Sequence, residues 1–251
     1  MNKLIWLVVA IVVVFGGIYY VVSSKPDVPE NSNVEGTNKN ESVDAQGRVI
    51  FSVTDAAANM NTISEINMQV EGVYAHSSAS GWVTVSSAPR TYSLLLLKSE
   101  NKSELLADVN IKAGTYDQVR LMVDSVSVKT KAGVTKEAKL PSSELKINTM
   151  LVVNENSTAS VNFDFLADKS LHATGNGNYI FAPVVKTETR SDATVNIDAK
   201  SAVAISGGRV DNTNTVGMDI DGSVKLNFQI NSNAKLNLDA NNVIKLEGVL
   251  N

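Results

Sequence analysis

The chain has 251 residues, a formal net charge of −4, no cysteine and two histidines. Its lysines and arginines are scattered, so no basic surface is available for a phosphate backbone, and we predict no nucleic-acid partner. The lack of cysteine excludes disulfides, thiolate metal ligands and cysteine nucleophiles.

An uncharged apolar run at residues 4–22 predicts a transmembrane helix. At 1.5 Å per residue the run spans about 28 Å, which is close to the hydrocarbon core of a bilayer. Trp6 lies near one end and Tyr19 and Tyr20 near the other, where aromatic rings favour the membrane interface. We therefore predict that the chain contacts a membrane through this run.

The charges around the run predict its orientation. Lys3 and the amino terminus precede it, which favours a cytoplasmic N-terminus and places the bulk of the chain outside the cytoplasm. A signal peptide cleaved before Lys25 is the alternative, but the run exceeds the usual apolar core of such peptides, so we favour an anchor over residues 1–24. Residues 25–47 contain two prolines, five acids and no aromatic residue, so they predict a disordered tether.

From Arg48 onward, apolar residues alternate with polar ones at a period of two, which is typical of strands with one buried face. A change of phase at Gly72 predicts a bulge, and Pro183 predicts an edge strand or a second bulge. The stretch 94–107 predicts one or two helical turns. For residues 48–190 we predict an all-β, mainly antiparallel β-sandwich. Strands are expected in the segments 49–53, 63–70, 82–85, 116–123, 159–165 and 179–186.

The last part of the chain, residues 191–251, has one aromatic residue and a short repeat. Lysine and then leucine recur every ten residues, first at Lys225 and Leu226, which predicts a β-meander with tight turns. Another strand is expected over 226–230. A core of this size would be marginal alone, so we expect this extension to pack on the main domain or to self-associate with another copy.

Six short segments occur in an order that resembles one protein family. They are VTDA at 53–56, GWVTV at 81–85, TYSLLLL at 91–97, AGTYDQVRL at 113–121, FDF at 163–165 and KSLHATGNGNYIFAPVV at 169–185. Over about residues 48–190 the chain resembles the domain of unknown function 4382 family. The resemblance implies an exported bacterial or archaeal surface protein with a carbohydrate-binding-like, prealbumin-like β-sandwich, and it supplies no catalytic residues.

The sequence carries no recognisable nucleophile motif. There is no GxSxG elbow, and the two histidines, His76 and His172, have no partner motif. The segment GNGN at 175–178 has too few glycines for a dinucleotide-binding loop. It predicts a turn in which Asn176 and Asn178 take positive φ angles.

The acidic residues also form no recognisable site. Asp219 and Asp221 would need further oxygen ligands to bind calcium, and Asp221 with Gly222 predicts a type I′ hairpin turn. Asp164 and Asp168 have the composition of a glycosidase pair, but Asp164 alternates with buried phenylalanines and is expected on a solvated face. We therefore predict a non-catalytic protein with no metal and no cofactor.

An outward-facing tryptophan is the strongest candidate for binding. If Val83 and Val85 face the core, Trp82 and Thr84 face the polar side of their strand, where a ring can stack on a sugar. The alternative is that Trp82 is covered by a neighbouring segment with its indole N–H satisfied. The same two interpretations apply to three tyrosines, which we include as candidate ligand-binding residues: Tyr74, Tyr92 and Tyr116.

Glycosylation sequons occur at Asn40, Asn101 and Asn156, as suits a surface protein. From these features we predict a membrane-anchored extracytoplasmic binding module for glycans or cell-envelope components. The alternative function is a structural subunit that assembles through strands of residues 191–251.

Overall fold

The computed structural model describes residues 45–57 and 60–247. The expected anchor, most of the expected tether and the sequon at Asn40 lie outside these ranges. The first strand begins at Gln46, so the last two residues assigned to the tether already belong to the folded domain. Within the described ranges, no helix is long and apolar enough to cross a membrane.

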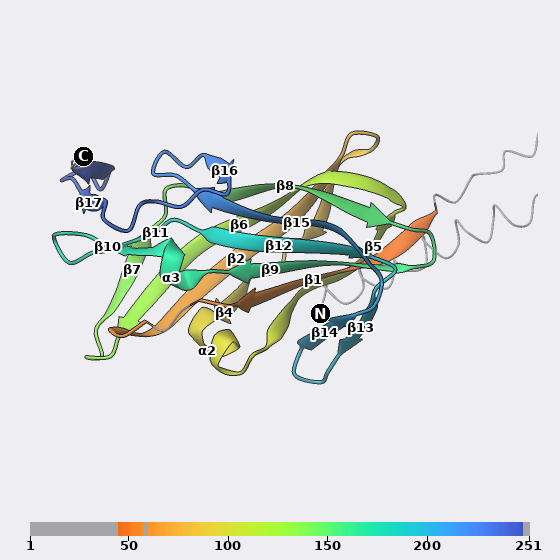
Figure 1. Ribbon diagram of the computed structural model, residues 1–251, viewed down its shortest axis with the longest axis horizontal. Coiled ribbons are helices and arrows are strands. Elements are labelled where there is room, and N and C mark those ends of the chain that lie inside the picture. Colours follow the sequence, from red (N-terminus) through yellow and green to blue (C-terminus); the bar gives the residue numbers. More distant parts are fainter. Residues whose placement is uncertain (1–44, 58–59, 248–251) are drawn as a thin grey trace, which may run out of the picture. The chain divides into compact units, whose positions relative to one another are not determined.

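The described chain consists mainly of two β-sheets, which confirms the prediction of an all-β protein (Figure 1). The first sheet contains, in spatial order, β13 (Thr194–Ile197), β14 (Ala202–Ser206), β5 (Ser103–Lys112), β1 (Gln46–Asp55), β9 (Thr158–Phe165), β12 (Val184–Ser191), β15 (Arg209–Met218) and β16 (Val224–Leu226). The second sheet contains β10 (Leu171–Ala173), β11 (Tyr179–Phe181), β7 (Thr135–Lys139), β6 (Gly114–Thr130), β2 (Ile63–Ser77) and β3 (Gly81–Ser86), while β4 (Arg90–Ser93) pairs with β2 and β8 (Glu144–Val153) with β6. The short helices are α2 (Leu94–Ser99), inside the stretch predicted to form helical turns, and α3 (Ala167–Ser170).

The inward residues of both sheets meet in one apolar core. In β1 the residues expected to face the core, Val49, Phe51 and Val53, are fully buried, but Ile50 and Ser52 between them are fully buried as well, so both faces of this part of the strand are covered. Phe51 stacks on Phe163 of β9 at a centroid distance of 6.5 Å. Strand β1 pairs antiparallel with β5 but parallel with β9, and β11 pairs parallel with β7. The other strand pairs of the described residues are antiparallel, as predicted.

The bulge predicted at Gly72 is present and has a counterpart in the neighbouring strand. The pair Val70–Val123 is flanked by one extra residue in each strand, Asp124 in β6 and Glu71 in β2. Each extra residue shifts the alternation by one position. Because the shifts occur side by side, β2 and β6 change phase together and keep their apolar side chains on the core face.

Pro183 lies between strands rather than at the edge of a sheet or in a bulge, so this prediction was wrong. It occupies the break between β11 and β12, where the chain passes from the second sheet to the first. Strand β12 lies inside its sheet, between β9 and β15. Proline lacks the N–H that a ladder requires, but its carbonyl accepts a hydrogen bond from the N–H of Met218 at 2.9 Å.

Several hairpins close through the same five-residue turn. In each one, the carbonyl of the first residue accepts the N–H of the fourth, and the N–H of the first donates to the carbonyl of the fifth. The fourth residue has a positive φ angle, so glycine or a small polar residue occupies it. The turns span residues 130–134, 174–178, 198–202, 219–223 and 239–243, with Gly133, Gly177, Ser201, Gly222 and Asn242 at the fourth position.

This shared turn corrects two predictions. In GNGN, the positive φ belongs to Gly177 and not to Asn176 or Asn178. In the turn after β15, Gly222 has a φ of 82° while Asp221 is not in the positive region, so the turn is not type I′, which requires two such residues.

The residues beyond 190 are divided between the main sheet and a separate hairpin. Strands β14 and β15 extend the first sheet by pairing with β5 and β12. The first copy of the ten-residue repeat, in β16, pairs back onto β15, whereas the other two copies pair with each other as β17 (Lys235–Leu238) and β18 (Ile244–Glu247). The repeat is therefore not one continuous meander. The strand expected over 226–230 ends at Leu226, because Asn227 takes a φ of 51°.

Candidate binding face

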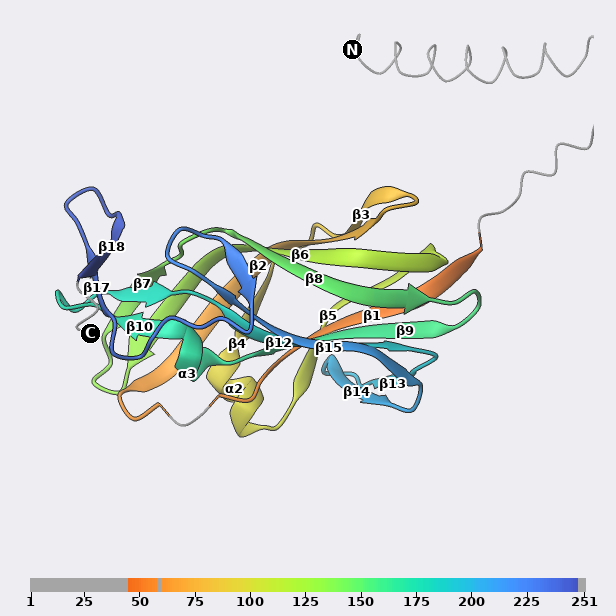
Figure 2. The ribbon, with the colours of Figure 1, turned by 45° about the horizontal axis from the view of Figure 1, so that its top comes forward.

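The outer face of the second sheet carries aromatic, charged and amide side chains in cross-strand rows. Trp82 of β3 lies opposite His76 of β2, which lies opposite Gln118 of β6, and β6 in turn pairs with β8 (Figure 2). The next row starts at Thr84 and continues through Tyr74. We call this set the aromatic face: Tyr74, His76, Trp82, Thr84, Gln118, Arg120, Glu144, Lys146 and Asn148.

Trp82 lies on the surface of this face and is 45% exposed. The indole ring contacts two neighbours: the His76 ring at a centroid distance of 4.9 Å, and Arg120, whose Cζ lies 4.0 Å from the indole centroid. Its indole N–H makes no hydrogen bond to any described residue. The side chain is thus supported from the protein side and retains a free donor and free ring surface.

Arg120 is held over the indole by its own hydrogen bonds. Its Nε donates to Gln118 Oε1 at 2.8 Å, and its terminal nitrogen donates to Glu144 Oε1 at 2.6 Å. Partial burial opposes ionisation of Glu144, but hydrogen bonds from Lys146 and Arg120 outweigh it and lower the pKa of this carboxyl. The guanidinium is therefore fixed by a carboxylate that stays ionised at neutral pH.

His76 is fixed in a similar way by Asp117. The ring Nδ1 lies 2.6 Å from Asp117 Oδ1, and the Ser78 hydroxyl donates to the other carboxylate oxygen at 2.5 Å. Hydrogen bonds from Ser78 and then His76 lower the pKa of Asp117, so the ionised carboxylate accepts the Nδ1 proton. The ring nitrogen Nε2 has no hydrogen-bond partner among the described residues.

The candidate tyrosines divide into one surface residue and two core residues. Tyr74 is half-buried on the aromatic face, and its ring lies over Gly72, where a Cβ would be 3.2 Å from Tyr74 Cε2. Tyr92 and Tyr116 are each 1% exposed, and their hydroxyls donate to the carbonyls of Leu105 and Lys112. Burial raises the pKa of both. These two rings are not accessible to a ligand, which corrects the prediction for them.

The histidines and acids considered as catalytic groups lie on different elements of the fold. His76 and His172 lie on β2 and β10, which are separated by three strands in the sheet order. Asp164 is half-buried rather than solvated, since its Oδ1 accepts the N–H of Ala56 at 2.7 Å, and burial raises its pKa. Asp168 lies in α3. Among the residues that the structure describes, no group of acids or histidines has the arrangement of a metal site.

The two described sequons lie in turns. Asn101 and Asn156 are exposed and have φ angles of 48° and 56°. Ser157, inside the second sequon, donates its hydroxyl to Asp192 at 2.6 Å. Glycosylation at these asparagines stays a prediction.

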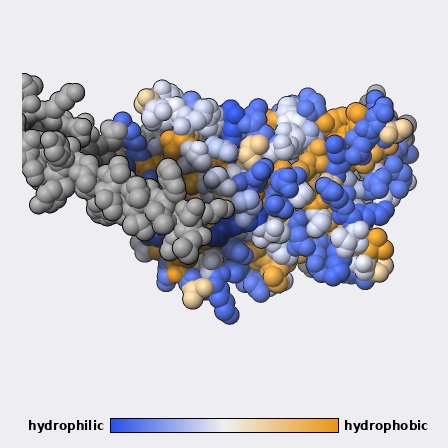
Figure 3. Space-filling view, turned by 180° about the vertical axis from the view of Figure 1, so that it is seen from behind, coloured by the Kyte–Doolittle hydropathy of each residue, from blue (hydrophilic) through white to orange (hydrophobic). Residues whose placement is uncertain are grey.

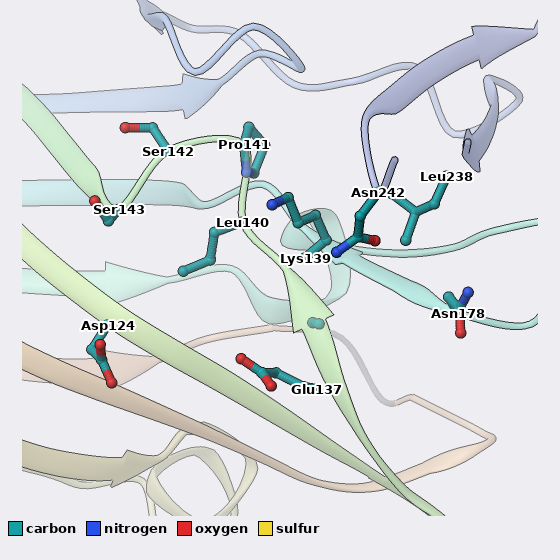
Figure 4. A pocket seen from close by; sticks show the side chains of 11 residues that line it. Asp124, Glu137, Lys139, Leu140, Pro141, Ser142, Ser143, Asn178, Leu238 and Asn242 are labelled. Carbon is teal, nitrogen blue, oxygen red and sulfur yellow. The ribbon is translucent and has the colours of Figure 1, made fainter. Parts of the chain in front are cut away.

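A polar pocket of about 510 Å³ contains none of the aromatic-face residues in its lining (Figure 4). Asp124 and Glu137 contribute from strands on one side, and Leu238 and Asn242 contribute from the C-terminal hairpin on the other. The lining contains no aromatic residue and no histidine. It offers neither a stacking surface nor a nucleophile with its base, so the aromatic face is the stronger candidate.

Sequence reasoning identified Trp82 and Tyr74 but missed the polar part of the face. The alternation in YDQVRLMV already places Gln118 and Arg120 on the outward phase of their strand. What the sequence alone does not reveal is that β6 pairs with β2, so that Arg120 reaches Trp82 from 38 positions along the chain.

The comparisons with known proteins identify a family. No curated protein matches the chain, and no solved structure matches it either. The pattern of the family described as "Domain of unknown function (DUF4382)" matches residues 46–183, which is more than half of the chain and runs from β1 to the break after β11. The aromatic face lies wholly within the match, and the chain belongs to the DUF4382 family.

Proposed function

We propose that this protein is a membrane-anchored, extracytoplasmic, non-catalytic module that binds glycans of the cell envelope or its surroundings. The observation that carries the proposal is Trp82, an exposed indole fixed between His76 and Arg120 on an open sheet face. The apolar run at residues 4–22 supports the membrane location, and the carbohydrate-binding-like character expected for the β-sandwich agrees with the proposed ligand class.

The chemistry of the aromatic face suits a sugar. A pyranose ring presents C–H groups on its faces, which stack on an indole, and hydroxyls on its rim, which need donors and acceptors. Around Trp82 the face offers its own indole N–H, His76 Nε2 and the Asn148 amide nitrogen, which make no hydrogen bond to another described residue. The Gln118 amide is already bonded to Asn148 and Arg120, and the Glu144 carboxylate is paired with Arg120 and Lys146, so these groups supply only additional hydrogen bonds. One stacking ring surrounded by mixed donors and acceptors is the arrangement expected for recognition of a hydroxyl-rich ligand.

The test compares variants of the full chain, purified in a detergent without a sugar head group, on a glycan array. Stacking contributes about 0.5–1.5 kcal/mol beyond the buried area, so Trp82→Ala should weaken glycan binding about tenfold. The matched control is Leu96→Ala, which removes another exposed apolar side chain, 52% exposed, on α2. This control should bind like the parent protein.

Thermal unfolding of the same variants checks that the effect is local. Trp82→Ala removes an exposed cation–π contact of about 0.5–1 kcal/mol, so its midpoint should fall only slightly. A loss of about 3–5 kcal/mol, typical of an emptied aromatic core site, would show that Trp82 acts as a core residue. The proposal is wrong if no glycan binds the parent protein, or if Trp82→Ala binds as the parent does.

The alternative, a structural subunit that assembles through the C-terminal strands, has less support. The edge strands of the first sheet, β13 and β16, have four and three residues, and short edges are a common defence against strand addition. Size-exclusion chromatography of the full chain separates the two functions, because an assembling subunit would form concentration-dependent oligomers.

A further inference from the structure

A second polar surface continues the outer face of the second sheet beyond the aromatic face. It is a groove of about 460 Å³ over β2, β4, β6 and β7. We call it the polar groove, and its outward side chains are Asn67, Gln69, Thr91, Ser125, Ser127, Thr135 and Glu137.

The groove presents hydrogen-bonding groups that the protein does not use. Gln69 lies between Thr91 of β4 and Ser125 of β6, so one row carries an amide and two hydroxyls. Asn67 and Ser127 form part of the next row, two residues further along β2. The side chains of the first row and of Ser127 make no hydrogen bond to another described residue. Such groups are free to bind a hydroxyl-rich ligand.

The paired bulges keep the groove and the aromatic face on the same side of the sheet. Gln69 faces outward before the bulges, and Tyr74 faces outward after them, although five positions separate the two residues. Without a bulge, an odd separation would place them on opposite faces. The ring of Tyr74 leans over Gly72, toward the groove. From His76 to Asn67 the continuous face extends about 30 Å along β2 at about 3.3 Å per residue.

The charges along this face select against an anionic ligand. The groove rows contain amides and hydroxyls, while the bulge residues Glu71 and Asp124 are exposed acids and Glu137 adds a third at the groove. The cations of the same face, Arg120 and Lys146, lie on the aromatic face, where Glu144 is paired with both of them. Viewed from behind, hydrophilic residues cover most of the described surface, and hydrophobic residues lie among them (Figure 3). An uncharged ligand rich in hydroxyls matches the groove rows, whereas a polyanion would meet three carboxylates.

We propose that the aromatic face and the polar groove form one elongated site for a linear, uncharged polysaccharide that runs along β2 and β6. The inference rests on the proposed function and goes beyond it by assigning the ligand's charge, shape and direction. Trp82 stacks on one sugar unit, and the groove amides and hydroxyls bind units further along the chain. Binding therefore strengthens with the length of the oligosaccharide.

The test uses the full chain with neutral β-glucan, mannan and xylan, each as disaccharide and hexasaccharide, and with polygalacturonate as the acidic polymer. The parent should bind one neutral hexasaccharide about tenfold more tightly than its disaccharide, the gain expected from two extra hydrogen bonds. The double variant Gln69→Ala, Ser125→Ala should lose this length advantage and keep the disaccharide affinity. Asn110→Ala, an exposed asparagine on β5, is the matched control and should keep both affinities.

Each outcome separates the inference from the proposed function. Trp82→Ala should weaken binding of both oligosaccharide lengths. If Trp82 is needed but the two lengths bind equally, or if the groove variant keeps the length advantage, the elongated site is wrong while glycan binding stands. Tighter binding of polygalacturonate overturns the uncharged ligand class. If none of these saccharides binds the parent protein, both proposals fail. A common thermal midpoint for all the variants excludes misfolding as the cause.

Discussion

Asp55, at the end of β1, is a buried carboxylate that accepts a hydrogen bond from the first residue of α3. It is 3% exposed, and its Oδ1 accepts the N–H of Ala57 at 2.8 Å and that of Ala167 at 3.3 Å. Its Oδ2 has no hydrogen-bond partner within the described residues. Burial raises the pKa of Asp55 to about 6, although the two N–H donors oppose the shift. The ionised form of this residue therefore weakens the fold.

The raised pKa predicts a pH-dependent stability. Between pH 3.8, the ordinary value, and about pH 6 the unfolded chain releases the Asp55 proton while the folded chain keeps it, so the free energy of unfolding falls as the pH rises. The loss is at most about 3 kcal/mol. Asp55→Asn removes this dependence, so its thermal midpoint relative to the parent should rise between pH 4 and pH 7 and then level off. Thermal denaturation across this range measures it.

Asp108 provides a control, because its contribution to stability changes with pH in the opposite direction. Arg48 donates two hydrogen bonds of 2.8 Å to its carboxylate and lowers the pKa of Asp108, so this pair stabilises the fold above the ordinary pKa and less at lower pH. Asp108→Asn should thus lose stability relative to the parent as the pH rises from 3 to 5. A midpoint difference for Asp55→Asn that stays constant with pH would show that the buried carboxylate does not titrate as described.

At the scale of single elements, the shared hairpin turn makes one residue position testable. Gly133 occupies the fourth position of the β6–β7 turn with a φ of 88°, and a Cβ there would meet no atom within 4 Å. The cost of adding a side chain at this position therefore comes from the backbone conformation alone. Gly133→Ala should lower stability by about 1–2 kcal/mol, measured by chemical denaturation.

Asparagine provides the matched comparison for this turn. It tolerates the left-handed region better than alanine, and Asn242 already occupies the equivalent position in the β17–β18 turn with a φ of 62°. Gly133→Asn should therefore be closer to the parent protein than Gly133→Ala. Equal losses for the two variants would contradict a conformational origin of the cost.

The elements also show how far sequence reasoning reaches. The alternation of apolar residues predicted β1, β2, β6 and β9 because it records burial of one face, and the glycine at the phase change predicted the bulge at Gly72. The sequence did not predict that Pro183 lies between two sheets. Proline is tolerated wherever no ladder hydrogen bond needs its N–H, and this is true both of a break between sheets and of an edge strand. Likewise, the local alternation predicted that Trp82 faces outward. Arg120 and Glu144 lie on β6 and β8, and no pattern within one segment predicts that these strands join the same sheet as β3.

At the scale of the whole molecule, the apolar run at residues 4–22 predicts that the strand-rich part of the chain, residues 45–247, lies outside the cytoplasm. We call this part the β-domain. A protease added to intact cells should release the β-domain by cutting in the segment 25–44, while the N-terminal fragment stays in the membrane fraction. Immunoblotting with antibodies against the two parts measures this. A soluble form that begins near Lys25 would instead show cleavage of a signal peptide, and full protection of the β-domain would contradict export.

The parallel pairing of β1 with β9 has a consequence for how the chain folds. Phe51 and its partner Val161 are separated by 110 positions, so the centre of the first sheet closes only after a long loop has been ordered. During synthesis or translocation, β5 becomes available to β1 long before β9 does. Until then one edge of β1 is open, and its apolar side chains are exposed to other chains. Folding is therefore expected to be slow and to depend on protection of β1 until residue 165 has emerged.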